Sequence, residues 1–338
     1  MPPFAVPYGP AKVINWGFVG CGAVTEVKSG PAFADFPSSR IRGVYARRTD
    51  RAADWVTRHG GDVVYPSLDD MLSDAQVDAV YIATRPDSHL RFARQVISAG
   101  LPAVVERPMG RTAAEAAEID AEASSSGVPV WVPYYRRQLP RFVLAHRLLR
   151  EGAVGEVTSV SYRFSQPAHR QWPAAATDWR LDPVISGGGL FRDMAGHALD
   201  LIDHLVGHID RAERVDALEP GSGPAHRLER SVSMAFTVGG TVTGTGSWSY
   251  ASGVREDCLD ILGTKGRMRL RLYLDHLVLI DTPGGQIRYA RPDPEHVYSP
   301  FVRHVVTALT TGTGGSSTAA AHRTAVWLDE TMPGTAAG

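Results

Sequence analysis

The sequence has little cysteine and no long apolar run. Of its 338 residues only two are cysteine, Cys21 and Cys258, which is too few for a disulfide framework and indicates a reduced compartment. No stretch of about 18 consecutive apolar residues is present, so no transmembrane helix is predicted. The first ten residues are rich in proline and lack the charged and apolar regions of a signal peptide. We therefore expect a cytoplasmic protein.

An excess of positive charge is also absent. The formal net charge is −1, so the chain has no basic surplus to neutralise the phosphates of a nucleic acid or an anionic membrane. Lysine occurs only at Lys12, Lys28 and Lys265, and this bias toward arginine weakens any inference from a single arginine. The length and the content of 43% hydrophobic and 21% charged residues are typical of a soluble globular protein with about two domains.

An apolar run that starts at Val13 ends in closely spaced glycines. Gly20 and Gly22 fill the first two positions of G-x-G-x-x-G, a motif that lets backbone N–H groups approach a pyrophosphate at a helix N-terminus. The third position is Thr25, where glycine or alanine usually allows close packing of the helix on the strand. By itself the motif fits an ordinary strand-to-helix turn equally well. The dinucleotide contacts expected in this turn are Gly20, Cys21, Gly22, Ala23 and Val24.

From residue 12 to about 132, short apolar runs alternate with helical patterns. Such alternation predicts right-handed βαβ units and a doubly wound parallel sheet. The glycine turn follows the first strand of this sheet, which favours a dinucleotide site. The further strands are expected at 41–46, 63–65, 77–83, 102–106 and 130–132, and the helices from about 23 and over about 51–58, 88–99 and 113–124.

The end of the second predicted strand bears on the choice of dinucleotide. NAD sites usually place an acidic residue about 20 residues past the glycines to bind the ribose 2′-hydroxyl, whereas a basic residue there accommodates a 2′-phosphate. Here the residues are Arg47, Arg48 and Thr49, and a guanidinium can pair a phosphate bidentately. The plainer alternative is a turn with two solvated arginines. We expect these three residues to bind NADP, with NAD as the second choice.

After residue 133 the apolar pattern changes to period two. Following a helix over about 140–150, this pattern predicts a C-terminal α+β domain (133–332) with a large, mostly antiparallel open sheet. Hairpin turns are expected at Gly239-Gly240 and Gly284-Gly285. The fold class is therefore α/β, with an N-terminal Rossmann domain (1–132) and a disordered tail (333–338). The strands are expected at 156–164, 231–237, 241–250, 258–262, 267–272 and 277–280, and further helices near 300–310 and 319–331, the last of which can pack back on the Rossmann domain.

One segment combines a glycine-rich entry with two chemically active side chains. Gly187-Gly188-Gly189 precede a predicted helix that places Asp193 and His197, four residues apart, on one face. A carboxylate and an imidazole together can act as an acid/base pair, although a helical surface pair or a histidine satisfied inside the domain contact is the alternative. His197, His204 and His208 lack a metal-ligand spacing, and a G-x-S-x-G elbow is absent. We therefore predict neither a metal site nor a serine hydrolase.

Several motifs in order resemble those of the Gfo/Idh/MocA oxidoreductases. The resemblance extends over essentially residues 12–331 and implies a Rossmann domain that binds NAD(P) and a C-terminal domain that covers it. Substrates, commonly sugars, cyclitols or related cyclic diols, then lie between the domains, where hydride transfer at nicotinamide C4 interconverts a hydroxyl and a carbonyl. A homodimer or homotetramer through the open sheet is also implied. The motifs are Gly17 to Gly22, Ala83 to His89, Glu106-Arg107-Pro108, Tyr134 to Arg137, and the glycine-rich segment up to His197.

The resemblance also implies roles for single residues. His197 is the expected proton donor or acceptor for the reacting oxygen, because a proton must move at oxygen while hydride moves at carbon. Asp193 is expected to contact the substrate or His197. The residues that frame the cofactor are then Ala83, Thr84, Arg85, Pro86, His89, Glu106 and Arg107.

Arg107 departs from the family pattern, which is typically Glu-Lys-Pro with a lysine that hydrogen-bonds the reacting oxygen. Arginine stays protonated, so it can polarise a carbonyl or hold a carboxylate but cannot shuttle a proton. Three interpretations stay open: His197 catalyses with Arg107 as an electrostatic stabiliser; the substrate is anionic or unusual, such as an acidic sugar or an imine; or turnover is weak or lost, as in a dinucleotide-binding regulator. We favour the first two together.

The remaining candidates are residues that could contact the substrate. Aromatic faces with polar tips suit the apolar face and hydroxyl edge of a sugar ring, although packing at the domain contact is the alternative for each aromatic side chain. Glycoside cleavage with tightly held NAD as a transient oxidant also occurs on this fold, but that class resembles an NAD site more than an NADP site. The candidates are Arg136, Arg137, Tyr162, Arg163, Trp172, Trp179 and Arg180.

Overall fold

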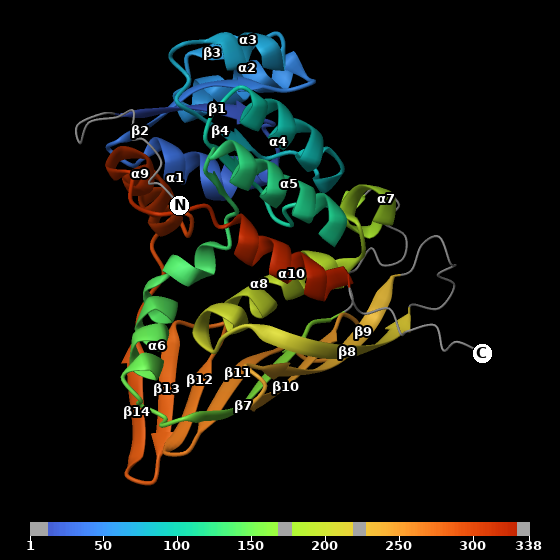
Figure 1. The fold of residues 1–338 in the computed structure, drawn as a ribbon, viewed down its shortest axis with the longest axis vertical. Coiled ribbons are helices and arrows are strands. Elements are labelled where there is room, and N and C mark those ends of the chain that lie inside the picture. The colour runs from blue at the N-terminus through green and yellow to red at the C-terminus, as the bar shows by residue number, and fades with distance from the viewer. Residues whose placement is uncertain (1–12, 168–177, 219–227, 330–338) are drawn as a thin grey trace. The chain divides into compact units, whose positions relative to one another are not determined.

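The computed structural model describes residues 13–167, 178–218 and 228–329, in which the chain forms two compact units (Figure 1). The first unit contains Met1–Gln138 and Pro294–Arg323, and the second contains Leu139–Asp293 and the residues from Thr324 onward. The chain therefore leaves the first unit, builds the second, and returns. Trp172, a predicted substrate contact, and the predicted tail 333–338 lie outside the described residues.

The first unit is built on a six-stranded sheet with the order β3-β2-β1-β4-β5-β6. All its strand pairs are parallel, which confirms the predicted Rossmann fold. The strand order reverses between β1 and β4, and ligands of such sheets bind outside the carboxyl ends of the strands at that point. The strands are β1 (Ile14–Val19), β2 (Ser39–Tyr45), β3 (Val63–Tyr65), β4 (Ala79–Ile82), β5 (Ala103–Val105) and β6 (Val130–Trp131).

Helices cover this sheet because its central strands are apolar on both faces. All four residues of β4 are buried, as is typical of a parallel sheet enclosed in a doubly wound fold. Helix α9, from the returning segment, packs beside α1 in this unit. The sequence did not predict α3, a short helix whose main signal is the cap that Ser67 Oγ makes with the Asp70 N–H at 3.1 Å. The helices are α1 (Gly30–Ala34), α2 (Thr49–His59), α3 (Leu68–Ser73), α4 (His89–Ser98), α5 (Ala113–Ser126) and α9 (Ser299–Thr311).

The helix after the glycine turn starts at the predicted place and then widens into a π-helical turn, η1 (Thr25–Ser29), before α1. Thr25, at the third position of the glycine motif, is fully buried, and its hydroxyl donates to the carbonyl oxygen of Gly22 at 2.8 Å. The close approach in this turn falls at Gly30, where a Cβ would lie 2.2 Å from the carbonyl oxygen of Thr25. The turn thus accepts threonine at position 25 but requires glycine at position 30.

The second unit is built on an eight-stranded sheet with the order β14-β13-β12-β11-β7-β10-β9-β8. Only the β7–β10 pair is parallel, so the mostly antiparallel sheet is confirmed. Three residues, 239–241, connect β9 and β10, and the Thr241 N–H donates to Val238 O at 3.3 Å. Gly239 and Gly240, the central residues of this β-turn, have φ values of 55° and 68°, which glycine adopts readily. The strands are β7 (Val157–Ser165), β8 (Ile209–Leu218), β9 (Glu229–Val238), β10 (Val242–Ser249), β11 (Glu256–Gly263), β12 (Gly266–Leu270), β13 (Leu277–Thr282) and β14 (Gly285–Ala290).

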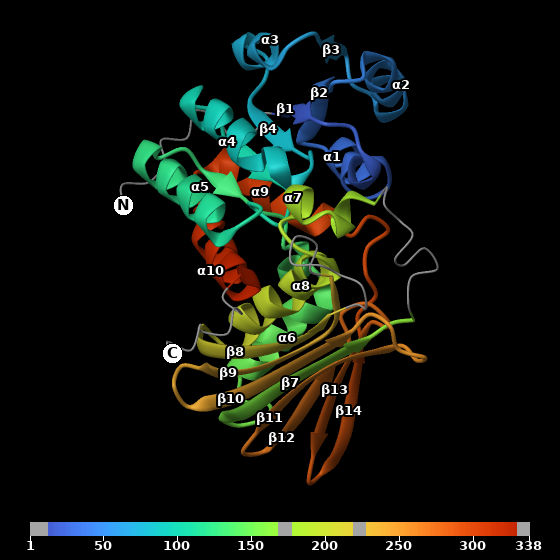
Figure 2. The same cartoon turned by 90° about the vertical axis from the view of Figure 1, so that its right-hand side faces the viewer.

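The helices of the second unit lie on one face of its sheet. Helix α8 packs on this face, with the Phe191 ring centroid 5.1 Å from that of Trp248. Figure 2 shows α6 and α8 on the same side of the sheet, and no helix of the described second unit lies over the other side. The predicted open sheet is therefore present. The helices are α6 (Pro140–Arg150), η4 (Trp179–Leu181), α7 (Pro183–Ser186) and α8 (Leu190–Leu205). A last helix, α10 (Thr318–Asp329), begins in the first unit and ends in the second.

We predict that Gly30→Ala destabilises the first unit by about 1–3 kcal/mol, because the added Cβ meets a backbone oxygen that cannot move aside. In an ordinary helix interior the same change stabilises by ~1 kcal/mol. The measurement is the free energy of unfolding in urea. Gly253→Ala, where a Cβ meets no atom within 4 Å, is the control, and a Gly30→Ala protein as stable as its parent would contradict the prediction.

Candidate functional site

The glycine turn at the end of β1 has one side open. Gly20 has a φ of 98°, its N–H donates to Tyr45 O at 2.9 Å, and a Cβ there would lie 3.1 Å from Ala83 O. A Cβ on Gly22 would meet no atom within 4 Å. Gly20 is thus required by the turn, whereas Gly22 leaves the backbone accessible to a ligand, as the second glycine of a dinucleotide motif does.

The neighbouring residues of the turn fit the same interpretation. Gly22 and Ala23 are exposed, while Cys21 and Val24 are half-buried. Burial raises the pKa of the Cys21 thiol, which keeps it protonated and argues against a nucleophile. The residues present therefore fit the pyrophosphate of a dinucleotide, held by backbone N–H groups.

Two arginines follow the end of β2, and they differ in their contacts with the other described residues. Arg47, Arg48 and Thr49 are all exposed. Arg48 pairs with Asp50 at 2.7 Å, and this contact lowers the pKa of the Asp50 carboxyl to about 2. Within the part of the chain that the structure describes, Arg47 makes no hydrogen bond or ion pair. Arg47 is therefore the basic group here that is available to an anion.

A buried histidine joins the loops that follow β4 and β5. His89 is fully buried; its Nδ1 lies 2.9 Å from Pro108 O and its Nε2 lies 3.1 Å from Thr84 O. Burial lowers the pKa of His89. Ser88 Oγ also donates to Thr84 Oγ1 at 2.8 Å. These contacts fix the loop that carries Thr84 relative to the loop that carries Arg107.

Adjacent parallel strands bring the predicted cofactor residues to one edge of the sheet. Strands β2, β1, β4, β5 and β6 are neighbours, so the segments that follow their carboxyl ends share that edge. Arg85 is exposed, Pro86 is buried and Arg107 is half-buried. Arg136, which follows β6, is buried with its guanidinium carbon 5.3 Å from the Tyr135 ring centroid, and Arg137 is half-buried.

In the second unit, helix α8 carries Asp193 in its first turn and His197 one turn later. Arg180 stacks on Trp179, with its guanidinium carbon 4.4 Å from the ring centroid, and its Nε lies 3.5 Å from Asp193 Oδ2. His197 is 5% exposed. The structure thus brings Trp179 and Arg180 to Asp193, which lies on α8 one turn before His197.

Tyr273 lies beside His197 and was not predicted. The two ring centroids are 6.4 Å apart, and the Tyr273 hydroxyl donates to Met194 O at 3.3 Å. Tyr273 follows β12 in a loop without a recognisable motif, so no pattern in the sequence connects it with α8. Its position makes it a further polar group next to the predicted acid/base residue.

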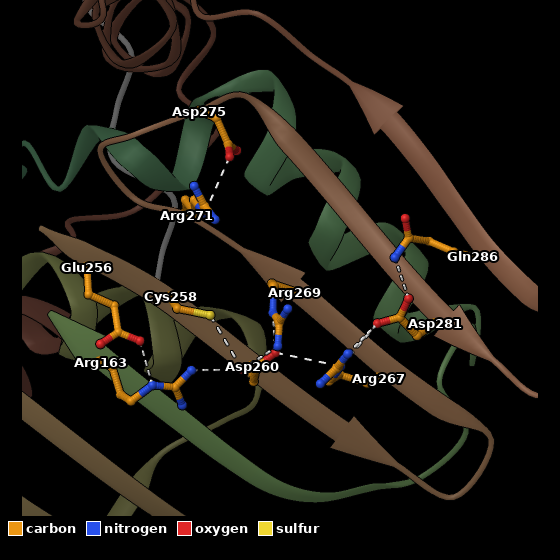
Figure 3. Close-up of polar contacts among 10 residues, drawn as sticks. All are labelled: Arg163, Glu256, Cys258, Asp260, Arg267, Arg269, Arg271, Asp275, Asp281 and Gln286. Carbon is orange, nitrogen blue, oxygen red and sulfur yellow. Dashed lines mark hydrogen bonds and ion pairs between the residues drawn. The ribbon is translucent and has the colours of Figure 1, made fainter.

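Two predicted substrate contacts lie elsewhere in the second unit. The Tyr162 side chain is buried and its hydroxyl donates to Asp257 Oδ1 at 3.2 Å. Because side chains alternate along β7, Arg163 points to the opposite, open face, where it pairs with Glu256 at 2.8 Å (Figure 3). The sheet therefore separates Arg163 from α8 and His197, and the structure does not bring it to this site.

Among the residues that the structure describes, no group of three or more His, Cys, Asp or Glu side chains is arranged to hold a metal ion. None of the described helices has the length and apolar character needed to span a bilayer.

Comparisons with known proteins cover both units. Residues 14–134 match the model of an oxidoreductase family with an NAD-binding Rossmann fold, and residues 142–269 match the GFO/IDH/MocA C-terminal domain. Oxidoreductase P35 of Formosa agariphila is 32% identical over 87% of this chain and 90% of its own length. The trans-1,2-dihydrobenzene-1,2-diol dehydrogenase of Bos taurus is 26% identical over 76% of this chain and 74% of its own length.

Solved structures share the fold. Levoglucosan dehydrogenase in complex with NADH and levoglucosan has a TM-score of 0.83 at 19% identity and covers 93% of this chain and 95% of its own. KijD10, a 3-ketoreductase from Actinomadura kijaniata in complex with NADP, has a TM-score of 0.80 at 20% identity. It covers 95% of this chain and 97% of its own. Since the family models match most of the chain, the protein belongs to the Gfo/Idh/MocA oxidoreductases, enzymes that act on CH–OH groups with NAD(P).

Proposed function

We propose that this oxidoreductase uses NADP(H) to interconvert a hydroxyl and a carbonyl on a sugar-like or other cyclic substrate. The main support is the shared edge of β1, β4 and β5, where the open side of Gly22, the loop at Thr84 and the guanidinium of Arg107 follow neighbouring strands. The names of similar proteins refer to levoglucosan, a cyclic diol and a 3-keto group, which supports a cyclic substrate.

The preference for NADP rests on the end of β2. Arg47 is exposed and makes no ion pair with the described residues, while Arg48 is occupied by Asp50. No acidic residue occupies the strand end before Asp50 to accept a hydrogen bond from a ribose 2′-hydroxyl. Arg47 therefore holds the 2′-phosphate, with Thr49 as a second donor. The bound nicotinamide supplies or accepts the hydride.

We predict that NADPH binds more tightly than NADH and that Arg47→Ser weakens NADPH binding about 10- to 100-fold, since a charge-assisted pair contributes about 1.5–3 kcal/mol. Binding of NADH should change less than threefold. The measurement is a fluorescence titration of each reduced cofactor. Arg94→Ser, on the exposed face of α4, is the control, and equal affinity of the parent for both cofactors would contradict the assignment.

Proton transfer is assigned to His197. Its Nδ1 is buried, so Nε2 is the nitrogen that exchanges a proton with the reacting oxygen. Asp193 orients the substrate together with Arg180, whose Nε lies 3.5 Å from Asp193 Oδ2. Arg107 remains charged at all physiological pH values, so it stabilises negative charge on the reacting oxygen but does not move a proton.

We predict that His197→Gln lowers kcat by about 10²- to 10⁴-fold, the usual contribution of a positioned general acid or base. Cofactor affinity should stay within twofold, because the cofactor residues belong to the first unit. The measurement combines steady-state kinetics with the cofactor titration. His322→Gln, a partly exposed histidine on α10, is the matched control; full activity of His197→Gln would remove the assignment.

Arg107 also favours a second candidate. A guanidinium fits a carboxylate or another anionic group bidentately, which suits an acidic sugar, and it tolerates an imine nitrogen as the reacting atom. A third candidate is a regulator that binds the dinucleotide and turns over slowly or not at all, since the lysine of the family pattern is missing. These candidates share the cofactor site and differ only in what happens at Arg107 and His197.

We also propose that two copies of the chain pair through the open face of the eight-stranded sheet. A charged cluster lies on this face, and its side chains pair with one another (Figure 3). The cluster consists of Arg163, Glu256, Asp260, Arg267, Arg269 and Asp281. Asp260 is 5% exposed; it accepts from Arg269 Nε at 2.9 Å and lies 3.6 Å from Arg163 Nη2. Beside the cluster, Ser161, Thr245 and Ala235 are adjacent in the strand register. Paired charges and small side chains favour a flat contact with a second copy.

We predict that Thr245→Arg, in the centre of this small-residue patch, converts the oligomer into a folded monomer. The longer charged side chain holds two such faces apart. Sedimentation velocity at micromolar concentration is the measurement, with Ser125→Arg on the exposed face of α5 as the control. A parent protein that sediments as a monomer, or a Thr245→Arg protein that remains an oligomer, would contradict the proposal.

A further inference from the structure

A carboxylate lies inside the first unit directly before Arg107. Glu106 is 6% exposed. The hydroxyls of Tyr81 and Tyr298 donate to its Oε1 at 2.6 and 2.8 Å, and the backbone N–H of Arg107 donates to its Oε2 at 3.1 Å. A carboxylate accepts hydrogen bonds through both oxygens, so these donors together match an ionised side chain.

Both tyrosines are built to remain donors. Each is fully enclosed, and burial raises the pKa of Tyr81 and that of Tyr298 well above the ordinary value. The phenols therefore keep their protons under all ordinary conditions. Hydrogen bonds to a charged acceptor are stronger than those between neutral groups, so the two hydroxyls determine where the Glu106 carboxylate lies.

Tyr298 reaches this carboxylate from a distant part of the chain. It is the N-cap residue of α9, in the segment that returns to the first unit, and is separated from Glu106 by 192 residues. Its ring also packs against Tyr135, with the centroids 4.6 Å apart. Tyr298 thus connects the loop after β5 with the segment after β6, which carries Arg136.

We propose that Tyr298 is a positioning residue for Arg107. Together with Tyr81 it holds the Glu106 carboxylate, and that carboxylate fixes the backbone N–H of Arg107. A buried carboxylate that loses a donor is unfavourable, so removal of one hydroxyl loosens the loop that presents the guanidinium. The effect of the lost hydroxyl on catalysis rests on the proposed function, whereas its effect on the Arg107 amide does not.

The test compares Tyr298→Phe, which removes the hydroxyl and keeps the ring against Tyr135, with Tyr81→Phe, which removes the other donor. Tyr289→Phe, on β14 of the second unit, is the control. Hydrogen–deuterium exchange of the full-length protein is read by mass spectrometry on a peptide that spans 103–110, with electron-transfer fragmentation to separate the Arg107 amide from its neighbours. We expect exchange of this amide to be at least tenfold faster in either variant and unchanged in the control.

Activity provides the second readout. Once a substrate is known, Tyr298→Phe should lower kcat about tenfold and change the substrate KM less than twofold, because the loosened Arg107 supports the transition state less well. Unchanged exchange at Arg107 would overturn the proposal. Faster exchange across the whole first unit, or failure of Tyr298→Phe to fold, would do so as well, because the hydroxyl would then serve the fold. A parent without turnover would count against the proposed function only.

Discussion

The parallel pairing of β1 with β4 and of β4 with β5 is the constraint on which the candidate site depends. Because these strands run in the same direction, the glycine turn, the loop at Thr84 and the loop at Arg107 all leave the sheet at one edge. His89 joins the second loop to the third through two backbone carbonyls. A buried carboxylate, Glu106, then fixes the backbone of the residue that replaces the usual lysine. Backbone topology and two buried polar side chains therefore position this half of the site.

Arginine in place of lysine changes the chemistry more than it changes the charge. A lysine can take part in proton movement, whereas a guanidinium only stabilises negative charge. In the second unit His197 is the imidazole to which we assign proton transfer, and Asp193 is already engaged by Arg180. Proton transfer in our account thus rests on His197 alone, and Arg107 favours substrates whose reacting oxygen develops negative charge or that carry an acidic group.

The sequence predicted the elements whose apolar residues have a clear period. Both sheets, the hairpin at Gly239-Gly240 and the bounds of α6 were correct, because burial on one or both faces leaves a periodic trace. It missed β8 and β14, which are edge strands with few buried side chains. It also missed Tyr273 and Tyr298, whose contacts come from distant parts of the chain and follow no local spacing. Placement of Arg163 on the open face required the register of β7, because a shift of one residue exchanges the two faces.

The central claim is that hydride passes between the nicotinamide and a cyclic substrate while His197 moves the proton. The most direct measurement uses NADPH deuterated at nicotinamide C4, incubated with a panel of keto-sugars, sugar acids and cyclic imines, with the products analysed by mass spectrometry. Our account predicts a product that carries one deuterium on the former carbonyl carbon. Tight binding of NADPH without deuterium transfer to any compound of the panel would contradict it, and transfer to the imines alone would replace the carbonyl substrate with the second candidate.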